Sequence, residues 1–265
     1  MSERPQMQPA GWFLLAIYPL IWLIDLSWWQ LAPDVLIIVG ILPLAWFLNR
    51  RVGESAARRP SLTRVGVLLL AIGILLNRIS LMAFAWSWLA TDYVFPATKL
   101  SRARLWVLCT GAFPWILVEG QKVGWYFRLT GADLTVWLYD LLNYEVTGGG
   151  TLLEIEGLPI SVETACSGLQ LLQVLLSGGI ALTLIRFPKE PGFWCMLALL
   201  PVLAWFANTV QIIVIAAWGI HFGAKAAAGA FHTWGTLIVV LSMLGAYVVC
   251  AKLLDLFKKR RLPAY

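Results

Sequence analysis

The chain has little charge, little histidine and little cysteine. Only 13% of its 265 residues are charged and 60% are hydrophobic, whereas a soluble domain carries about 25% charged residues. Its two histidines and four cysteines show no CxxC or zinc-ligand spacing. This composition excludes a soluble domain and implies neither a metal nor a cofactor. The net charge of +6 does not indicate nucleic-acid binding, because no basic face would be free of the membrane.

Long apolar runs fill most of the chain. A membrane-spanning helix needs about 20 apolar residues, and fifteen tryptophans suit aromatic belts at two bilayer interfaces. Connections between the runs are short, so we expect one integral membrane domain over residues 1–265. The candidate spans are residues 11–31, 33–49, 64–90, 104–119, 166–187, 192–219 and 233–253.

Three basic segments set the expected orientation. Arginines gather in residues 50–64, and both the stretch RFPKEP and the C-terminal KKRRLPAY are basic. Cytoplasmic loops of membrane proteins carry an excess of Lys and Arg. We therefore expect a multi-pass protein of the cell inner membrane with a cytoplasmic C-terminus.

This orientation brings the rarest side chains to one face of the membrane. The helix 166–187 then starts outside, and so does the last helix, which follows the loop 220–231. Cys166, His221 and His232 all belong to these two boundaries. We expect the three side chains to share the external, periplasmic face.

The number of crossings depends on one ambiguous region. If each of the seven spans is a single helix, Cys166 would lie on the cytoplasmic side of the membrane. The expected external position of Cys166 therefore requires one more crossing. Residues 64–96 supply it if they form two short helices with Asn77 and Arg78 near the junction, and residues 121–143 supply it if they cross. We favour the first, because the amphipathic 121–143 segment suits an interfacial helix. The expected fold is an all-α polytopic membrane protein of about eight helices, with seven as the alternative.

A short β-prone stretch precedes Cys166. In YEVTGGGTLLEIEGLPISVE the three glycines predict a turn, and two strand-like runs flank Gly157, Leu158 and Pro159. We expect a small external hairpin that covers the cavity above Cys166.

Cys166 stands where an apolar helix is predicted to start, in VETACSGLQLLQ. A helix N-terminus favours negative charge, so it lowers the pKa of a thiol placed there. Ser167 and Gly168 let backbone amides approach a bound group and hold an oxyanion, and Glu163 is a further polar neighbour. The alternative is a cysteine that only packs at an interface.

Two amides and two histidines follow later in the chain. Asn208 and Gln211 are three residues apart and share a helix face. Amides inside a bilayer line a cavity or bond to a neighbouring helix. His221 and His232 bracket one external loop, and His232 is a candidate general base, although a single interfacial histidine is often inert.

Three motifs in this order resemble a known family. VETACSGLQ, then NTVQI, then GAFHTWG is similar to the pattern of the exosortase/archaeosortase family of membrane cysteine transpeptidases. The resemblance is strongest over residues 100–250. In that family the ACSGL run carries the nucleophile, and a hairpin precedes it as it does here.

The resemblance implies a Cys-Arg-His triad. Cys166 is then the nucleophile and His232 the base, while the arginine position falls on Gln211. Glutamine donates neutral N–H groups but brings no charge to the thiolate. Arg78 and Arg128 are possible substitutes for the missing arginine, and the sequence leaves the choice between them open.

The resemblance also implies the substrates. These are exported proteins with a C-terminal sorting signal, made of a short motif, a hydrophobic helix and a basic tail. Cleavage passes through a Cys166 thioester to an unidentified amine acceptor, or to water in a protease variant. Two alternatives remain: a catalytically inactive membrane assembly protein, and a permease lined by Asn77, Arg78, Asn208 and Gln211. A permease is disfavoured because the chain has no internal repeats.

Overall fold

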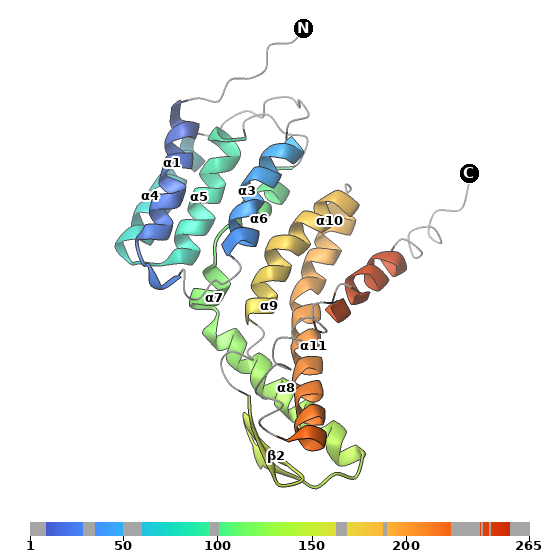
Figure 1. Cartoon of the computed structure of the whole chain (residues 1–265). Coiled ribbons are helices and arrows are strands. Elements are labelled where there is room, and N and C mark those ends of the chain that lie inside the picture. The colour runs from blue at the N-terminus through green and yellow to red at the C-terminus, as the bar shows by residue number, and fades with distance from the viewer. Residues whose placement is uncertain are drawn as a thin grey trace, which may run out of the picture. The chain divides into compact units, whose positions relative to one another are not determined.

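The computed structural model describes most of the chain, in two compact units (Figure 1). Unit 1 comprises Met1–Glu119 and Leu176–Arg186, and unit 2 comprises Gly120–Leu175 and Phe187–Tyr265. The expected single domain stays a prediction. The described residues are 9–28, 35–49, 60–95, 101–162, 169–187, 190–223, 239, 241–243 and 245–254.

Described residues of unit 1 are helical, and unit 2 combines helices with a small sheet. The helices of unit 1 are α1 (Pro9–Leu23), α3 (Val35–Asn49), α4 (Pro60–Leu75), α5 (Ile79–Tyr93), α6 (Arg102–Thr110), α7 (Trp115–Glu119) and α10 (Ile180–Arg186). Unit 2 contains α8 (Gln121–Leu141), β1 (Val146–Gly149), β2 (Leu152–Ile155), β3 (Leu158–Ser161), α9 (Leu169–Val174) and α11 (Glu190–Phe222). A π-helical turn, Leu175–Gly179, joins α9 to α10.

One described helix has the length and composition of a membrane span. It is Pro191–Phe222, with 32 residues, and the other apolar helices are shorter. The mostly helical architecture agrees with the expected class, while the count of eight crossings stays a prediction. The shorter apolar helices are Pro9–Trp22, Thr63–Leu75, Leu176–Arg186 and Leu241–Leu254.

The predicted helix break near Asn77 and Arg78 is confirmed. Asn77 has φ 49°, a left-handed conformation that asparagine tolerates better than most residues. The Arg78 N–H then donates to Gly73 O at 2.8 Å, which satisfies a carbonyl at the end of α4. A Cβ on Gly73 would lie 2.9 Å from the Met82 backbone nitrogen, so glycine lets α4 and α5 pack closely.

The predicted span 104–119 is instead two helices. Pro114 has no N–H to donate, and α6 has already ended at Thr110 when α7 begins at Trp115. Side chains from distant segments satisfy buried carbonyls at this break: Tyr18 Oη donates to Ala112 O at 2.6 Å, and Ser177 Oγ donates to Gly111 O at 2.8 Å. Long-range hydrogen bonds therefore stabilise the break between α6 and α7, which the apolar composition of residues 104–119 does not indicate.

The expected hairpin before Cys166 is confirmed, with one correction. β2 and β3 pair antiparallel around Glu156 and Gly157. The glycine-rich stretch, predicted to be only a turn, also supplies β1, which pairs antiparallel with β2. Gly148 has φ 121°, and a Cβ there would lie 2.4 Å from Leu152 O. Glycine is thus required at this close strand contact. Because glycine is uncommon inside strands, the sequence did not indicate a strand here.

Candidate catalytic site

Most of the predicted site residues lie outside the part of the chain that the structure describes. Asn208 and Gln211 are described, and both lie on α11. His221 is exposed in the last turn of the same helix. The predicted residues outside the described ranges are Cys166, Ser167, Gly168, Glu163 and His232.

Helices α8 and α11 pack against each other and run in the same direction. Trp205 Nε1 donates to Thr130 Oγ1 at 2.8 Å. Further along both helices, Tyr139 Oη donates to Ile213 O at 3.0 Å. Residue numbers therefore rise together on the two helices, and these bonds fix their register. Figure 1 shows the small sheet beside α8 and α11.

A buried apolar cluster ties the sheet to this helix pair. Its members are Ala132 on α8, Leu153 on β2, Ile212 on α11, and Val162. Val162, 3% exposed, is the last described residue before the segment that contains Cys166. The chain therefore enters that segment from the buried cluster that also contains Ile212, the sequence neighbour of Gln211.

The far end of the segment belongs to the same unit. Leu169, 3% exposed, is the first described residue after it and begins α9. Helix α9 packs against both α8 and α11. The two ends of the Cys166 segment thus both attach to the structure that holds Gln211.

Asn208 and Gln211 are both buried. Asn208 is fully buried, and neither its side-chain oxygen nor its nitrogen has a hydrogen-bond partner among the residues that the structure describes. Gln211 is 7% exposed. Burying an amide without partners costs about 1–3 kcal/mol in proteins, so native structures keep few such groups and each calls for an explanation. Asn208 therefore has amide groups available to a water or a substrate.

Arg128 and Arg78, the two possible substitutes for a missing arginine, lie in different surroundings. Arg78 is exposed in the turn between α4 and α5, in unit 1. Arg128 lies on α8 in unit 2 and is half-buried, and its Nε has no hydrogen-bond partner within the described part of the chain. Arg128 thus shares a unit with Gln211, and Arg78 does not.

The sequence analysis overlooked Gln173 on α9. Its side chain is 1% exposed, and it belongs to the helix that follows the Cys166 segment. Helix α9 ends at Val174 and continues into the π-helical turn Leu175–Gly179, a feature that is frequent at functional sites. The available signal was a second glutamine inside the apolar run LQLLQ.

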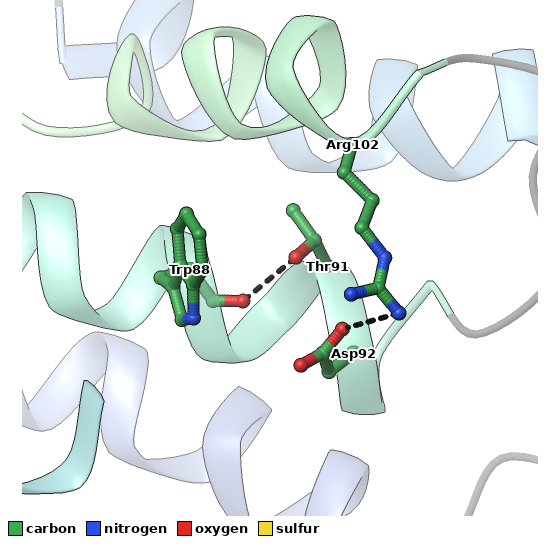
Figure 2. A network of polar contacts seen from close by, with 4 residues as sticks. All are labelled: Trp88, Thr91, Asp92 and Arg102. Atoms are coloured by element: carbon green, nitrogen blue, oxygen red, sulfur yellow. Dashed lines mark hydrogen bonds and ion pairs between the residues drawn. The ribbon is translucent and has the colours of Figure 1, made fainter. Parts of the chain in front are cut away.

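Unit 1 contains an ion pair between a buried aspartate and a partly exposed arginine (Figure 2). Asp92 Oδ1 lies 3.1 Å from Arg102 Nη2, although the two atoms are not aligned as a hydrogen bond. The Asp92 side chain is 3% exposed and that of Arg102 is 33% exposed. Beside it Thr91 Oγ1 donates to Trp88 O at 2.7 Å. This pair connects α5 to α6 and is a structural contact.

The described residues offer no metal centre. None of them form a group of three His, Cys, Asp or Glu side chains placed to hold an ion. The described part of unit 2 contains two buried amides on α11, Asn208 and Gln211, and the half-buried guanidinium of Arg128 on α8. Such groups suit the stabilisation of an anion.

Apolar helices that enclose buried amides are typical of an integral membrane protein with a polar site. The family model for transmembrane exosortases (Exosortase_EpsH) matches residues 2–248. The chain belongs to the transmembrane exosortase family, which confirms the resemblance and extends it well beyond residues 100–250. Comparisons with curated proteins and with solved structures found no match. Membership implies a membrane protein-sorting enzyme, and exosortases are generally cysteine transpeptidases.

Proposed function

We propose that this exosortase is a cysteine transpeptidase acting at the external face of the inner membrane. It cleaves the C-terminal sorting signal of exported proteins and transfers them to an amine acceptor. One observation carries the proposal: Val162, four residues before Cys166, belongs to the same buried cluster as Ile212, the neighbour of Gln211. This supports a shared site for two motifs that are 45 residues apart in the sequence, from Cys166 to Gln211.

Chain length supports this shared site. An extended chain advances at most about 3.3–3.6 Å per residue, so four residues span no more than about 14 Å. Cys166 is also only three residues from Leu169, which begins α9. These short separations support a role for Cys166 together with residues of α11.

The proposed reaction has two acyl-transfer steps. His232 takes the proton of Cys166, and the thiolate sulfur forms a bond with the scissile carbonyl carbon. The C–N bond then breaks, and His232 returns the proton to the leaving amine. The amine acceptor attacks the resulting thioester, forms the new amide bond and releases the cysteine thiol. Water takes the place of the acceptor in a hydrolytic variant.

Hydrogen-bond donors stabilise the tetrahedral intermediate. Gln211 and the backbone N–H groups near Ser167 hold the oxyanion, with Asn208 one turn away on α11. Removing one such donor typically slows acyl transfer by about 10²–10³-fold. The substrate's hydrophobic helix enters sideways from the bilayer, which brings its scissile bond to the membrane surface.

Cysteine replacement tests the proposal. Cys166→Ala is expected to insert normally into the membrane and to abolish cleavage of a co-expressed protein with a sorting signal. Cys195→Ala is the matched control, because Cys195 is exposed on α11 and has no proposed role. Normal cleavage by Cys166→Ala would remove the nucleophile from the account.

A second candidate is a family member without catalytic activity that serves membrane assembly. Gln211 favours it, because a neutral amide stands at the arginine position of the family. A Gln211→Arg variant separates the two. Cleavage at or above the parent rate identifies a weakened triad member, whereas complete loss means that the site is built around the amide. No cleavage by any variant, parent included, favours the assembly role.

A further inference from the structure

We propose that an exposed apolar stripe on α11 is a surface of unit 2 that contacts the acyl chains of the bilayer, and that this contact ends just beyond Phe206. The remainder of α11 and the small sheet then project from the hydrocarbon as a polar head. The inference uses the membership of a transmembrane family and does not depend on the proposed chemistry. The partner of the stripe is lipid hydrocarbon.

The stripe runs along one side of α11 and carries no charge. Cys195, Val202 and Phe206 are exposed and follow each other at spacings of seven and four residues, which keeps them on one side of a helix. Val202 is 55% exposed and Phe206 is 49% exposed. Such a surface suits acyl chains, which offer no hydrogen-bond partner. The other exposed residues between positions 191 and 207 are also uncharged: Pro191, Trp194, Ala198 and Pro201.

Beyond Phe206 the sheet covers the same side of the helix. Ile213, Ala217 and Ile220 are seven, eleven and fourteen residues after Phe206, which corresponds to about two, three and four helical turns. All three pack against the buried cluster that contains Ile155 of β2, and β3 also packs against α11. Figure 1 shows the sheet at this end of α11. The sheet therefore lies on the side of α11 that is exposed up to Phe206.

The sheet itself is unsuited to hydrocarbon. Glu154 on β2 is exposed, and its partners in the register, Thr147 on β1 and Pro159 on β3, are exposed as well. In the described sheet β1 and β3 each pair only with β2, so each presents an edge of backbone N–H and C=O groups. Open sheet edges do not occur facing lipid in the hydrocarbon region, and a carboxylate there is costly. The hydrocarbon therefore ends before the sheet, between Phe206 and Ile213.

The length of the helix agrees with this boundary. Gln211 lies 20 residues after Pro191, and this is about 30 Å at about 1.5 Å per residue. The hydrocarbon core of a bilayer is also about 30 Å thick. The buried amides of Asn208 and Gln211 then lie at the surface of the hydrocarbon, where a polar group reaches their depth without crossing it.

A deeper position of the sheet is the competing account. Trp218 is 37% exposed, and tryptophan is enriched at membrane interfaces. A boundary at the level of Trp218 would place the sheet inside one leaflet, with Glu154 facing lipid. The two accounts differ in what surrounds Glu154, so contact with lipid or water at that position separates them.

The test measures lipid and water contact at single spin-labelled positions. The full chain, with Cys166, Cys195 and Cys250 replaced by alanine, receives one new cysteine and is reconstituted in vesicles of phosphatidylethanolamine and phosphatidylglycerol. Cys109 is fully buried and is retained. Electron paramagnetic resonance then compares collisions with oxygen, which concentrates in hydrocarbon, and with a nickel chelate, which stays in water.

The two surfaces are expected to behave in opposite ways. Labels at Val202→Cys and Phe206→Cys should collide mainly with oxygen, and labels at Glu154→Cys and Thr147→Cys mainly with nickel. The oxygen-to-nickel ratio should fall several-fold from the stripe to the sheet. The native Cys195, labelled in a chain that retains it, repeats the stripe measurement without a new substitution and decides if Val202→Cys or Phe206→Cys does not fold.

Three results would overturn the proposal. Few collisions with either reagent at Val202 and Cys195 would mean that protein covers the stripe, as a second copy of the chain would. Frequent nickel collisions at these positions would show water there. A high oxygen-to-nickel ratio at Glu154 would place the sheet in hydrocarbon. None of these results depends on cleavage, so they are distinct from normal cleavage by Cys166→Ala, which would overturn the proposed function.

Discussion

The two units treat buried charge in opposite ways. In unit 1 the Asp92 carboxylate lies 3.1 Å from the Arg102 guanidinium, and Glu119 accepts a hydrogen bond from Ser80. In unit 2 the Nε of Arg128 is buried without a partner among the described residues. Breaking a buried ion pair costs stability, because it leaves an uncompensated charge. The comparison supports a structural role for the unit 1 pair, and it is consistent with the proposal that polar groups on α11 take part in chemistry.

The largest expected loss of stability comes from breaking the unit 1 ion pair. Arg102→Ala leaves the Asp92 carboxylate buried and unpaired, so we expect the free energy of unfolding to fall by about 3 kcal/mol, the low end for a broken buried pair. The low end applies because Arg102 is one-third exposed and partly screened. Unfolding in detergent measures this, while cleavage per folded molecule stays unchanged. Lys122→Ala is the exposed control, and equal effects of both variants would contradict the structural role.

Adding a methyl group at the close contact between α4 and α5 is expected to cause a somewhat smaller loss of stability. Gly73→Ala puts a Cβ 2.9 Å from the Met82 backbone nitrogen, and backbone cannot turn aside as a side chain can. We expect a loss of about 2 kcal/mol. Gly40→Ala, also in a helix but with nothing within 4 Å of its Cβ, should be neutral or stabilising by up to about 1 kcal/mol. If Gly73→Ala left stability unchanged, the helices would be able to move apart without cost, and the close contact would not be required.

Removing the hydrogen bond at the α6–α7 break is expected to cause the next smaller loss of stability. Tyr18→Phe removes the donor to Ala112 O, so we expect a loss of about 0.6–1.5 kcal/mol, the usual range for such bonds. Cleavage per folded molecule should not change. Tyr126→Phe, on a tyrosine that is 62% exposed, is the control. A drop in cleavage without a loss of stability would give unit 1 a part in the chemistry.

Asn208 is expected to show the smallest change in stability, with the opposite sign. Asn208→Leu replaces two unpartnered polar atoms with an apolar group of similar size, so stability should rise by less than about 1 kcal/mol. Cleavage should nevertheless fall. Thr183→Val removes a buried hydroxyl that is bonded to Gly179 O at 2.6 Å and should instead lose stability. If Asn208→Leu destabilises the protein and leaves cleavage intact, Asn208 is a packing residue.

The sequence predicted features that depend on local chemistry. The Asn77–Arg78 break, the hairpin before Cys166 and the apolar helix that carries Gln211 follow from turn residues, strand patterns and hydrophobicity. The order of the three motifs was enough to indicate the family, which the match over residues 2–248 confirms.

Features that depend on long-range contacts escaped prediction. The break in 104–119 depends on bonds from Tyr18 and Ser177, which no local pattern contains. Strand β1 was hidden by glycines that its pairing requires. The sequence left Arg78 and Arg128 open as substitutes for the missing arginine, and the structure adds only that Arg128 belongs to the same unit as Gln211.

Detection of the acyl-enzyme tests the central claim most directly. Membranes containing the exosortase and a sorting-signal substrate are quenched during cleavage, and Cys166 peptides are analysed by mass spectrometry with and without hydroxylamine. The account predicts a substrate-derived adduct on Cys166 that hydroxylamine removes and that is absent from Cys166→Ala membranes. Active cleavage with Cys166 unmodified at every time point would contradict it.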